Sequence, residues 1–440
     1  MTLCLIIFAI TYALIVTEKV DRTAAAILGA SAVIFLKLIP QEEALELINL
    51  DVIFLLVGMM TVVGILAETG LFEWVAVFIA QRARGNGLVI LFGLLIATAV
   101  LSAFLDNVTT VVLIVPITIL ITQILEIPTV PFLIFEALFS NIGGTATLVG
   151  DPPNILIGSE ANLTFNEFLI HLTPAVLLVM VAILVLVWFV FRGSLNVTPA
   201  ARSRIMKAVP ALTITDPFRL KRGLIVFFLI LFGFVFSRMI GVDPGTVALC
   251  GAFAMIVFTR SNVRQAMEKV EWETIFFLIG LFMLVGSLEH NGLFKLLGEA
   301  MFQLTQGNLL MTALATLWVS AVLSAVFGNI PVVIALIPLV HSLIPAFGTE
   351  MGLLDSEQLL TLRVAQPLWW SLALGSCLGG NGTLYGAAAN IVVAQIARKN
   401  NYPITFLQFT RYSFVTTIIS LVVCSLYVYV RYFLLASSPL

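Results

Sequence analysis

The chain has 440 residues, of which 60% are hydrophobic and only 10% are charged, and its mean hydropathy is +1.12. A soluble domain carries about 25% charged residues, so this composition excludes an ordinary soluble protein. The formal net charge of −2 comes without a basic face, which argues against a nucleic-acid partner. The sequence therefore predicts an all-α polytopic membrane protein that is embedded in the lipid bilayer.

Apolar segments long enough to cross a bilayer recur along the whole chain. A crossing helix needs about 20 mostly apolar residues, and a shorter segment extends into its polar flanks. Ten segments meet this description within a few residues at each end: 2–17, 23–39, 52–68, 130–158, 170–191, 223–241, 245–259, 273–288, 366–395 and 412–435. The first lacks a basic start and a small-residue cleavage motif, so we interpret it as a retained span and not as a signal peptide.

Two further apolar stretches are each interrupted in the middle by a polar pair: 88–126 by Asp106-Asn107, and 309–347 by Gly328-Asn329. Two full spans or one re-entrant hairpin would each fit this pattern. With hairpins, most of the 22 Lys and Arg residues fall on the same side as the basic loop 192–222, which the positive-inside rule places in the cytoplasm. We therefore predict two hairpins, with both termini outside.

The two halves of the sequence align with each other at a constant offset. This offset pairs Asn107 with Asn329, and after an insertion near 349–362 a slightly larger offset pairs Asn154 with Asn390. Each half then has five crossings and one hairpin, so the halves have opposite topology, as in the inverted repeats of secondary transporters. The predicted domains are a first repeat at 1–194, a cytoplasmic linker at 195–222 and a second repeat at 223–440.

The predicted helices are interrupted at four places, in two repeat-related pairs: hairpin tips at 106–110 and 328–331, and broken helices at 141–154 and 379–390. Irregular backbone at mid-membrane is tolerated only where it lines a cavity. Exposed helix N-termini at such breaks favour anions, and free carbonyl and side-chain oxygens favour Na⁺ or protons. The candidate substrate- and ion-binding residues are Asp106, Asn107, Thr109, Thr110, Gly143, Gly144, Thr145, Thr147, Asp151, Asn154, Asn329, Gly379, Gly380, Asn381, Thr383 and Asn390.

Three acidic residues lie in or near these breaks. A carboxylate at the bilayer centre costs at least about 2.5–3.5 kcal/mol on insertion scales, so Asp106, Asp151 and Glu136 are candidates for the group that binds the coupling proton or cation. Their repeat mates are not acidic, so this chemistry belongs to the first half alone. The competing interpretation is structural, because an Asp side chain can also cap a broken helix.

The breaks contain no Lys or Arg, so an anionic substrate would be held by helix ends, Asn, Thr and a co-bound cation. Cys377 could meet a soft metalloid such as arsenite, although a small packed residue is expected at that position in any case. No phosphate-binding loop or His-rich motif occurs, so we expect no ATP-driven step within this chain, no enzymatic activity, no cofactor and no metal beyond Na⁺.

Three segments carry a family resemblance: SAFLDNVTTVVLIVPIT (102–118), SNIGGTATLVGDPPN (140–154) and LGGNGTLYGAAANIVVAQIA (378–397). They resemble the ion-transporter superfamily, in its ArsB/NhaD/P-protein branch. The resemblance implies the fold of divalent-anion/sodium symporters, with a scaffold domain, often dimeric, and a transport domain holding two hairpins and two broken helices. It also implies that the family's binding positions correspond to Asn107, Thr109, Gly143, Thr147, Asn154, Asn329, Gly380, Thr383 and Asn390.

The hairpin tips depart from the Ser-Asn-Thr signature of the dicarboxylate transporters in this superfamily. They read Asp-Asn-Val-Thr and Gly-Asn-Ile-Pro, which argues against ordinary dicarboxylate binding. We therefore expect a secondary transporter of a small inorganic anion or oxyacid, arsenite-like, coupled to H⁺ or Na⁺ by elevator-type alternating access. A Na⁺/H⁺ antiporter and a passive anion channel are the alternatives. The expected setting is a homodimer in the plasma membrane of a prokaryote, and a soluble ATPase subunit remains an open alternative.

Overall fold

The computed structural model describes residues 2–17, 20–193, 195, 197–207, 209–353 and 356–435, so parts of the linker 195–222 and the last five residues lie outside the described residues. Within these ranges every regular element is helical. Eight helices are long and apolar enough to cross a membrane, and five shorter apolar helices accompany them. The prediction of an all-α polytopic membrane protein is confirmed.

The first half of the chain contains the helices α1 (Thr2–Thr17), α2 (Arg22–Phe35), α3 (Gln41–Glu46), α4 (Leu50–Ala67), α5 (Leu71–Arg82), α6 (Gly87–Ser102), α7 (Asn107–Leu125), α8 (Thr129–Gly144), α9 (Pro152–Glu160), α10 (Phe165–His171) and α11 (Thr173–Phe191). The central segment contains α12 (Pro199–Met206) and the short 3₁₀ helix η1 (Pro210–Thr213).

The second half contains α13 (Pro217–Ile240), α14 (Pro244–Thr259), α15 (Val263–Met267), α16 (Trp272–His290), α17 (Leu293–Leu304), α18 (Leu309–Phe327), α19 (Asn329–Glu350), α20 (Glu357–Leu360), η2 (Thr361–Ala365), α21 (Gln366–Gly379), η3 (Gly380–Gly382), α22 (Ala388–Lys399), α23 (Phe406–Tyr429) and η4 (Val430–Leu434). Helix α13 begins inside the segment expected to be linker. Helices α5 and α17 were not predicted, because their charged residues interrupt the apolar pattern that marks a span.

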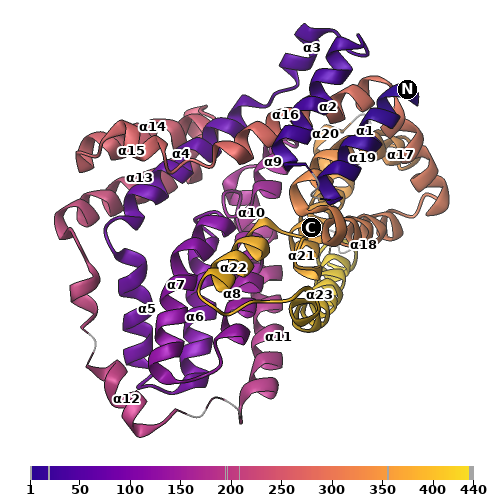
Figure 1. Cartoon of the computed structure of the whole chain (residues 1–440). Helices are drawn as coiled ribbons and strands as arrows, with labels where there is room; N and C mark the ends of the chain where they lie inside the picture. Colours follow the sequence, from indigo (N-terminus) through magenta and orange to yellow (C-terminus); the bar gives the residue numbers. More distant parts are fainter. Residues whose placement is uncertain are drawn as a thin grey trace.

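Helices α2, α4, α14 and α16 form one layer, which crosses the top of the molecule in Figure 1. Helix α4 packs along α14, and α16 packs along α2, so each contact joins one half of the chain to the other. We call this layer, with α1 and α13, the scaffold layer. Helices α6 to α9, α11, α18, α19 and α21 to α23 lie beneath it as a second group, which we call the core group (Figure 1).

Small residues allow the close crossings within the scaffold layer. A Cβ atom on Gly58 of α4 would lie 2.5 Å from the backbone of Ala248 in α14, and one on Gly280 of α16 would lie 2.7 Å from that of Ala26 in α2. Because lipid tails are as apolar as the side chains, helices in a membrane associate by such close packing. The offset that pairs Asn107 with Asn329 also pairs Gly58 with Gly280 and Ala26 with Ala248, so the two crossings are repeat mates.

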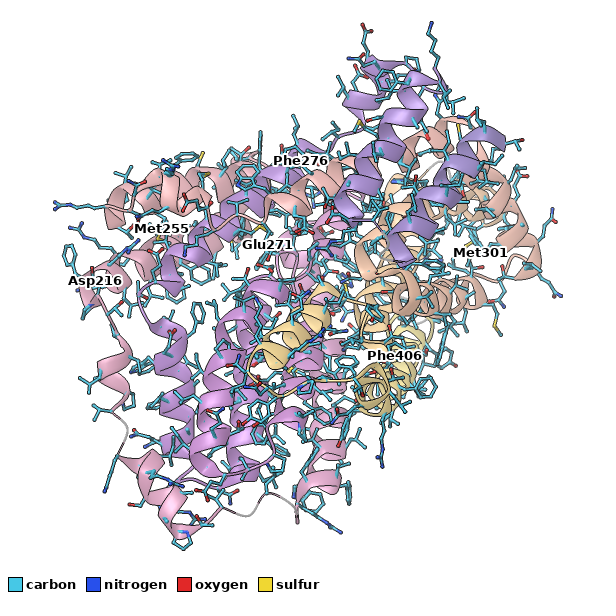
Figure 2. The ribbon with its side chains drawn as sticks, viewed as in Figure 1. Asp216, Met255, Glu271, Phe276, Met301 and Phe406 are labelled. Carbon is cyan, nitrogen blue, oxygen red and sulfur yellow. The ribbon has the colours of Figure 1, made fainter. Side chains whose placement is uncertain are left out.

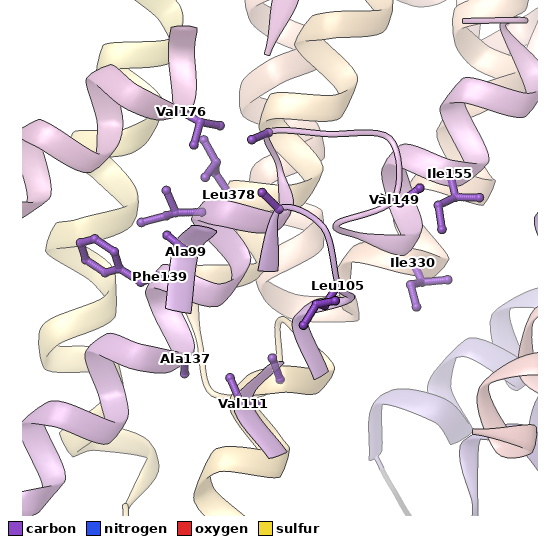
Figure 3. Close-up of a cluster of buried hydrophobic side chains, with 14 of the residues drawn as sticks. Ala99, Leu105, Val111, Ala137, Phe139, Val149, Ile155, Val176, Ile330 and Leu378 are labelled. Atoms are coloured by element: carbon purple, nitrogen blue, oxygen red, sulfur yellow. The ribbon is translucent and has the colours of Figure 1, made fainter. Parts of the chain in front are cut away.

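The core group contains the four interruptions. Helix α6 ends at Ser102 and α7 begins at Asn107, while α18 and α19 meet at Gly328, whose φ of +89° suits glycine. Loops at 145–151 and 383–387 separate α8 from α9 and η3 from α22. Buried apolar side chains from both halves, among them Leu105, Val149 and Ile330, pack around these loops (Figure 3).

Candidate functional site

Matching hydrogen bonds hold each broken helix against the hairpin of its own repeat. The Ser102 hydroxyl donates to Ser140 O at 2.6 Å, and its repeat mate Ser324 donates to Ser376 O at the same distance. In the loops that follow, the hydroxyls of Thr147 and Thr383 donate to the carbonyls of Ala103 and Ala325. Each loop is thus anchored to the turn of its own hairpin.

The glycines of the breaks allow this close approach. A Cβ atom on Gly143 would lie 2.1 Å from Ala99 O, and one on Gly379 would lie 2.4 Å from the Cα atom of Ala321. Gly144 and Gly380 face the carbonyls of Gly150 and Gly386 across their loops. These four predicted site glycines therefore act through backbone packing in this conformation.

An asparagine amide satisfies the free carbonyls of each loop. Asn154 Nδ2 lies 2.8 Å from Thr147 O and 3.1 Å from Thr145 O, and its mate Asn390 Nδ2 lies 3.0 Å from Thr383 O and 2.9 Å from Gly380 O. Both side chains are fully buried. Buried carbonyls need such partners, so these two asparagines hold the loops in shape.

A chain of buried amides joins the two halves at the centre of the core group. Asn141 Nδ2 donates to Asn381 Oδ1 at 2.7 Å and to Asn390 Oδ1 at 3.0 Å, while Asn141 Oδ1 accepts from Asn107 Nδ2 at 2.9 Å. The repeat mate of Asn141 is Cys377, whose thiol lies 3.4 Å from Asn154 Oδ1. The residue at this helix position therefore contacts the loop asparagine of the other repeat in both cases: Asn141 contacts Asn390, and Cys377 contacts Asn154.

Asp151 lies where the two hairpin tips meet. Its Oδ1 accepts from Asn107 Nδ2 and from Asn329 Nδ2, each at 3.1 Å. The side chain is fully buried, and its Oδ2 has no hydrogen-bond partner among the described residues. A buried carboxylate oxygen without a donor is costly, so this atom is positioned to accept a proton or an ion.

The other two predicted acids have different surroundings. Asp106 is the N-cap of α7: its carboxylate accepts from the Thr109 amide at 2.9 Å and from the Thr109 hydroxyl. Glu136 lies in α8, where its Oε1 accepts from the Thr118 hydroxyl at 2.5 Å and its Oε2 has no partner; among the described residues no hydrogen bond links it to the asparagines. Thr110 and Thr145 bond to carbonyls of their own helices. The geometry therefore brings Asp151, and neither of the other two acids, into the amide network.

Three adjoining cavities lead from one face of the molecule to Asp151. The outermost, of about 510 Å³, lies between α2, α16 and α22, and its lining includes Arg22, Glu271 and Gln395. A cavity of about 80 Å³ and one of about 20 Å³ follow, and the innermost is lined by Asp151 and Asp106. Glu271 lies between the scaffold layer and α22, near the middle of the view in Figure 2. The cavities on this face therefore extend to two residues of the amide network, Asn107 and Asn329.

Four helix N-termini converge on the innermost cavity. Its lining includes the first residues of α7 (Asn107), α9 (Pro152), α19 (Asn329) and α22 (Ala388). Each N-terminus carries a partial positive charge of roughly half an elementary charge. The α9 end acts through this dipole alone at its first two residues, because Pro152 and Pro153 have no N–H group. Four such ends around one small cavity favour an anion, and Asp151 supplies negative charge beside them.

Another cavity, of about 550 Å³, lies on the repeat-related surface. It is lined by Asp51 and Asp243, which are the repeat mates of Glu273 and Asp21 in the outermost cavity described above, and by Ser159, the mate of Gln395. Neither Asn107 nor Asn329, the two asparagines that donate to Asp151, lines it. In this conformation the site therefore communicates with one of two related cavities.

Sequence reasoning missed four residues of this region. Asn141 lies inside a predicted break but was not singled out, although a buried amide in an apolar helix is a usable signal. Cys377 was judged a packing residue. Arg22 and Glu271 begin scaffold helices, and nothing in their local sequence relates them to the breaks. Among the described residues, no cluster of His, Cys, Asp and Glu could hold a metal ion.

Comparisons with known proteins agree with this architecture. The profile of the family described as "CitMHS: Citrate transporter" matches residues 12–375. "Uncharacterized transporter Rv2684" of Mycobacterium tuberculosis is 41% identical to this chain over 98% of both chains, and the "46 kDa membrane protein" of Mycobacterium leprae is 39% identical over 98% of both. The "P protein" of Homo sapiens is 31% identical over 98% of this chain and 60% of its own length.

A solved structure shares the fold. The YdaH transporter of Alcanivorax borkumensis superposes with a TM-score of 0.57 at 14% sequence identity, covering 85% of this chain and 84% of its own. The predicted relation to the P-protein branch is confirmed by the matches above. The chain therefore belongs to the citrate transporter (CitMHS) family of integral membrane transporters.

Proposed function

We propose that this chain is a secondary active transporter that moves a small anion together with a proton carried by Asp151. The observation that carries this proposal is the position of Asp151 at the meeting point of two hairpin tips, with one carboxylate oxygen free of partners and four helix N-termini around it. The anion is an inorganic oxyanion or oxyacid or, as the family's description suggests, a small carboxylate such as citrate.

The same geometry gives a reason for coupling. A substrate charge held about 4 Å from an ionised carboxylate is repelled by about 4 kcal/mol at an effective dielectric constant of about 20. Protonating an ordinary aspartate at pH 7 costs about 4 kcal/mol, so the two energies are comparable. Anion binding therefore favours proton uptake by Asp151, and each ligand increases the affinity for the other. Na⁺ bound beside Asp151 would relieve the same repulsion.

A Na⁺/H⁺ antiporter is the second candidate. The observation that favours it is that two carboxyl groups, those of Asp151 and Asp106, line the innermost cavity. An exchanging carboxylate would then bind Na⁺ and H⁺ in turn, without an anion. A passive anion channel would instead conduct in proportion to the membrane potential.

Alternating access follows from the two repeat-related cavities. The outermost cavity at Arg22 lies on the face that the positive-inside rule assigns to the cytoplasm, and the cavity at Asp51 lies on the opposite face. An elevator-type movement of the core group against the scaffold layer would exchange them, as the inverted repeat suggests. Cysteines placed at residues 108 and 330 test this, since their labelling from each side should change with ions and substrate. We also propose a homodimer in a bacterial plasma membrane, supported by the bacterial relatives and the family resemblance.

Purified protein in liposomes that hold a pH-sensitive dye tests the proposal. Pulses of arsenite, phosphate, sulfate or citrate should move protons inward with one of these anions, saturably and without a requirement for Na⁺. Asp151→Asn should abolish proton movement, whereas Asp216→Asn, which keeps the cap of α13 on the surface, should leave it intact. Proton flux driven by Na⁺ or Li⁺ alone would establish the antiporter, and anion flux without protons or Na⁺ would establish the channel.

A further inference from the structure

Arg22 occupies a distinctive place on the approach to Asp151. It is the first residue of α2 in the scaffold layer, and it lines all three adjoining cavities, including the innermost one. Of the residues that the structure describes along these cavities, Arg22 alone is basic. Any anion that travels from this face to the four helix N-termini therefore passes one positive side chain.

The acids along the same path are already engaged. Asp21 accepts from the amides of Thr23 and Ala24 as the cap of α2, and Asp106 caps α7. Glu271 accepts from the Thr274 hydroxyl at 3.1 Å, and burial together with the nearby Asp106 carboxylate raises the pKa of Glu271 to about 7. These hydrogen bonds fix the carboxylates of Asp21 and Asp106 at helix N-termini, and Glu271 is only partly charged near pH 7. Among the described residues of this lining, Arg22 is the one basic side chain beside these acids.

Glu273 is the ion-pair partner of Arg22 that an incoming anion would replace. Arg22 Nε lies 3.5 Å from Glu273 Oε1 in a single contact, and the two side chains are 38% and 59% exposed. Exposed ion pairs of this kind contribute about 0–1 kcal/mol, so exchanging Glu273 for another oxyanion is inexpensive. The guanidinium also lies 5.6 Å from the centre of the Phe277 ring, which holds it at the cavity while the partner changes.

We propose that Arg22 captures the anionic substrate at this mouth by exchanging Glu273 for a substrate oxygen, and so determines the preference for anions over neutral solutes. This inference rests on the proposed anion transport and names the residue that selects the substrate. Arg22 can serve a carboxylate or an inorganic oxyanion equally, because its planar N–H groups match both. Its repeat mate is Pro244, so this charge has no counterpart at the same position of the opposite cavity.

The test measures KM and kcat for the transported anion, applied from the Arg22 face, in proteoliposomes of unaltered chain and variants. Arg22→Gln should raise KM at least tenfold and change kcat by less than about twofold. Glu273→Gln should lower KM at least twofold, because Arg22 is then free, and Arg22→Lys should recover most of the affinity. Arg264→Gln is the matched control, since Arg264 forms an exposed pair with Glu268 at 3.6 Å and lines none of these cavities.

Several results would overturn the inference. An unchanged KM in Arg22→Gln, or KM values that rise in both Arg22→Gln and Glu273→Gln, would show that the pair only holds α2 to α16. Equal melting temperatures of the variants and the unaltered chain exclude loss of folding as the cause. Absence of transport of any anion by the unaltered chain would instead overturn the proposed function, and the role of Arg22 with it.

Discussion

Asn107 and Asn329 donate hydrogen bonds to the same oxygen atom, Oδ1 of Asp151, each at 3.1 Å. The two asparagines are repeat mates at the tips of separate hairpins, whereas Asp151 has Ala387 as its mate. A symmetric backbone therefore surrounds an asymmetric charge. This arrangement places one carboxylate between two amides, one from each repeat.

Substitutions of Asp106 and of Asp151 should affect different properties, stability in the first case and proton coupling in the second. Asp106→Ala should lower the unfolding free energy by about 1 kcal/mol, because it removes the cap of α7. Asp151→Asn, which keeps a side-chain oxygen for Asn107 and Asn329, should abolish proton-coupled transport at comparable thermal stability. Thermal melting in detergent and flux in liposomes measure the two effects. Equal loss of coupling in both variants would contradict the assignment.

Asn141→Ala should destabilise the protein strongly. The substitution removes the donor that Asn381 Oδ1 and Asn390 Oδ1, both buried, now have at 2.7 and 3.0 Å. Each buried polar group without a partner costs about 1–3 kcal/mol. Asn400→Ala, which removes an exposed amide bonded to its own helix, is the control. A melting temperature as high as that of the control would show that the network relaxes without penalty.

Replacing a glycine of the breaks by alanine should push the broken helix away from the hairpin against which it packs. Gly143→Ala places a Cβ atom 2.1 Å from Ala99 O, and Gly379→Ala places one 2.4 Å from the Cα atom of Ala321. Overpacking of this kind costs about 1–3 kcal/mol or more. Gly193→Ala has no atom within 4 Å of its new Cβ and should be neutral. Thermal melting of the three variants compares them, and stability of Gly143→Ala equal to Gly193→Ala would argue against a fixed contact.

The affinity for the anion should fall above neutral pH because of Glu271. Its pKa is raised to about 7, so the side chain becomes charged between about pH 6 and pH 8 and then repels an anion near Arg22. The remaining charge along the same cavities comes from Asp106, Arg22 and Glu273. The KM should rise across this range in the unaltered chain and rise less in Glu271→Gln. Parallel plots of KM against pH for the two proteins would exclude Glu271 as the source of the pH dependence.

The unfolding free energy of the protein should decrease in mild acid because His171 takes up a proton more readily in the unfolded state. Burial and the charge of Arg431 lower the pKa of His171 to about 4, while its ring stacks on Trp370 and bonds the Tyr432 hydroxyl at 2.7 Å. An unfolded histidine has a pKa of about 6.5, so the unfolded state binds more protons between these values. Stability should therefore fall as pH drops from about 6.5 to about 4. His171→Gln should flatten this part of the profile, and His290→Gln on the surface should not.

The sequence by itself determined the class of protein and the places where its helices break. Sixty per cent hydrophobic residues require a membrane. Pro152 and Pro153 occupy the first two positions of α9, where a preceding helix cannot continue through them, and Gly328 ends α18. The constant offsets between the two halves related the tips and loops in pairs before any contact was known. Helices α5 and α17 were not predicted, because charged residues interrupt the apolar pattern that marks a span.

Only the tertiary structure decided which polar groups meet. Asp106 and Asp151 look equivalent in sequence, but one faces the amides of its own helix and the other faces asparagines from two distant hairpins. Asn141 and Arg22 gain their significance from neighbours in the opposite half of the chain, Asn390 and Glu273. Local sequence fixes backbone geometry through sterics, whereas the partner of a buried amide or charge depends on which helices pack together across the chain.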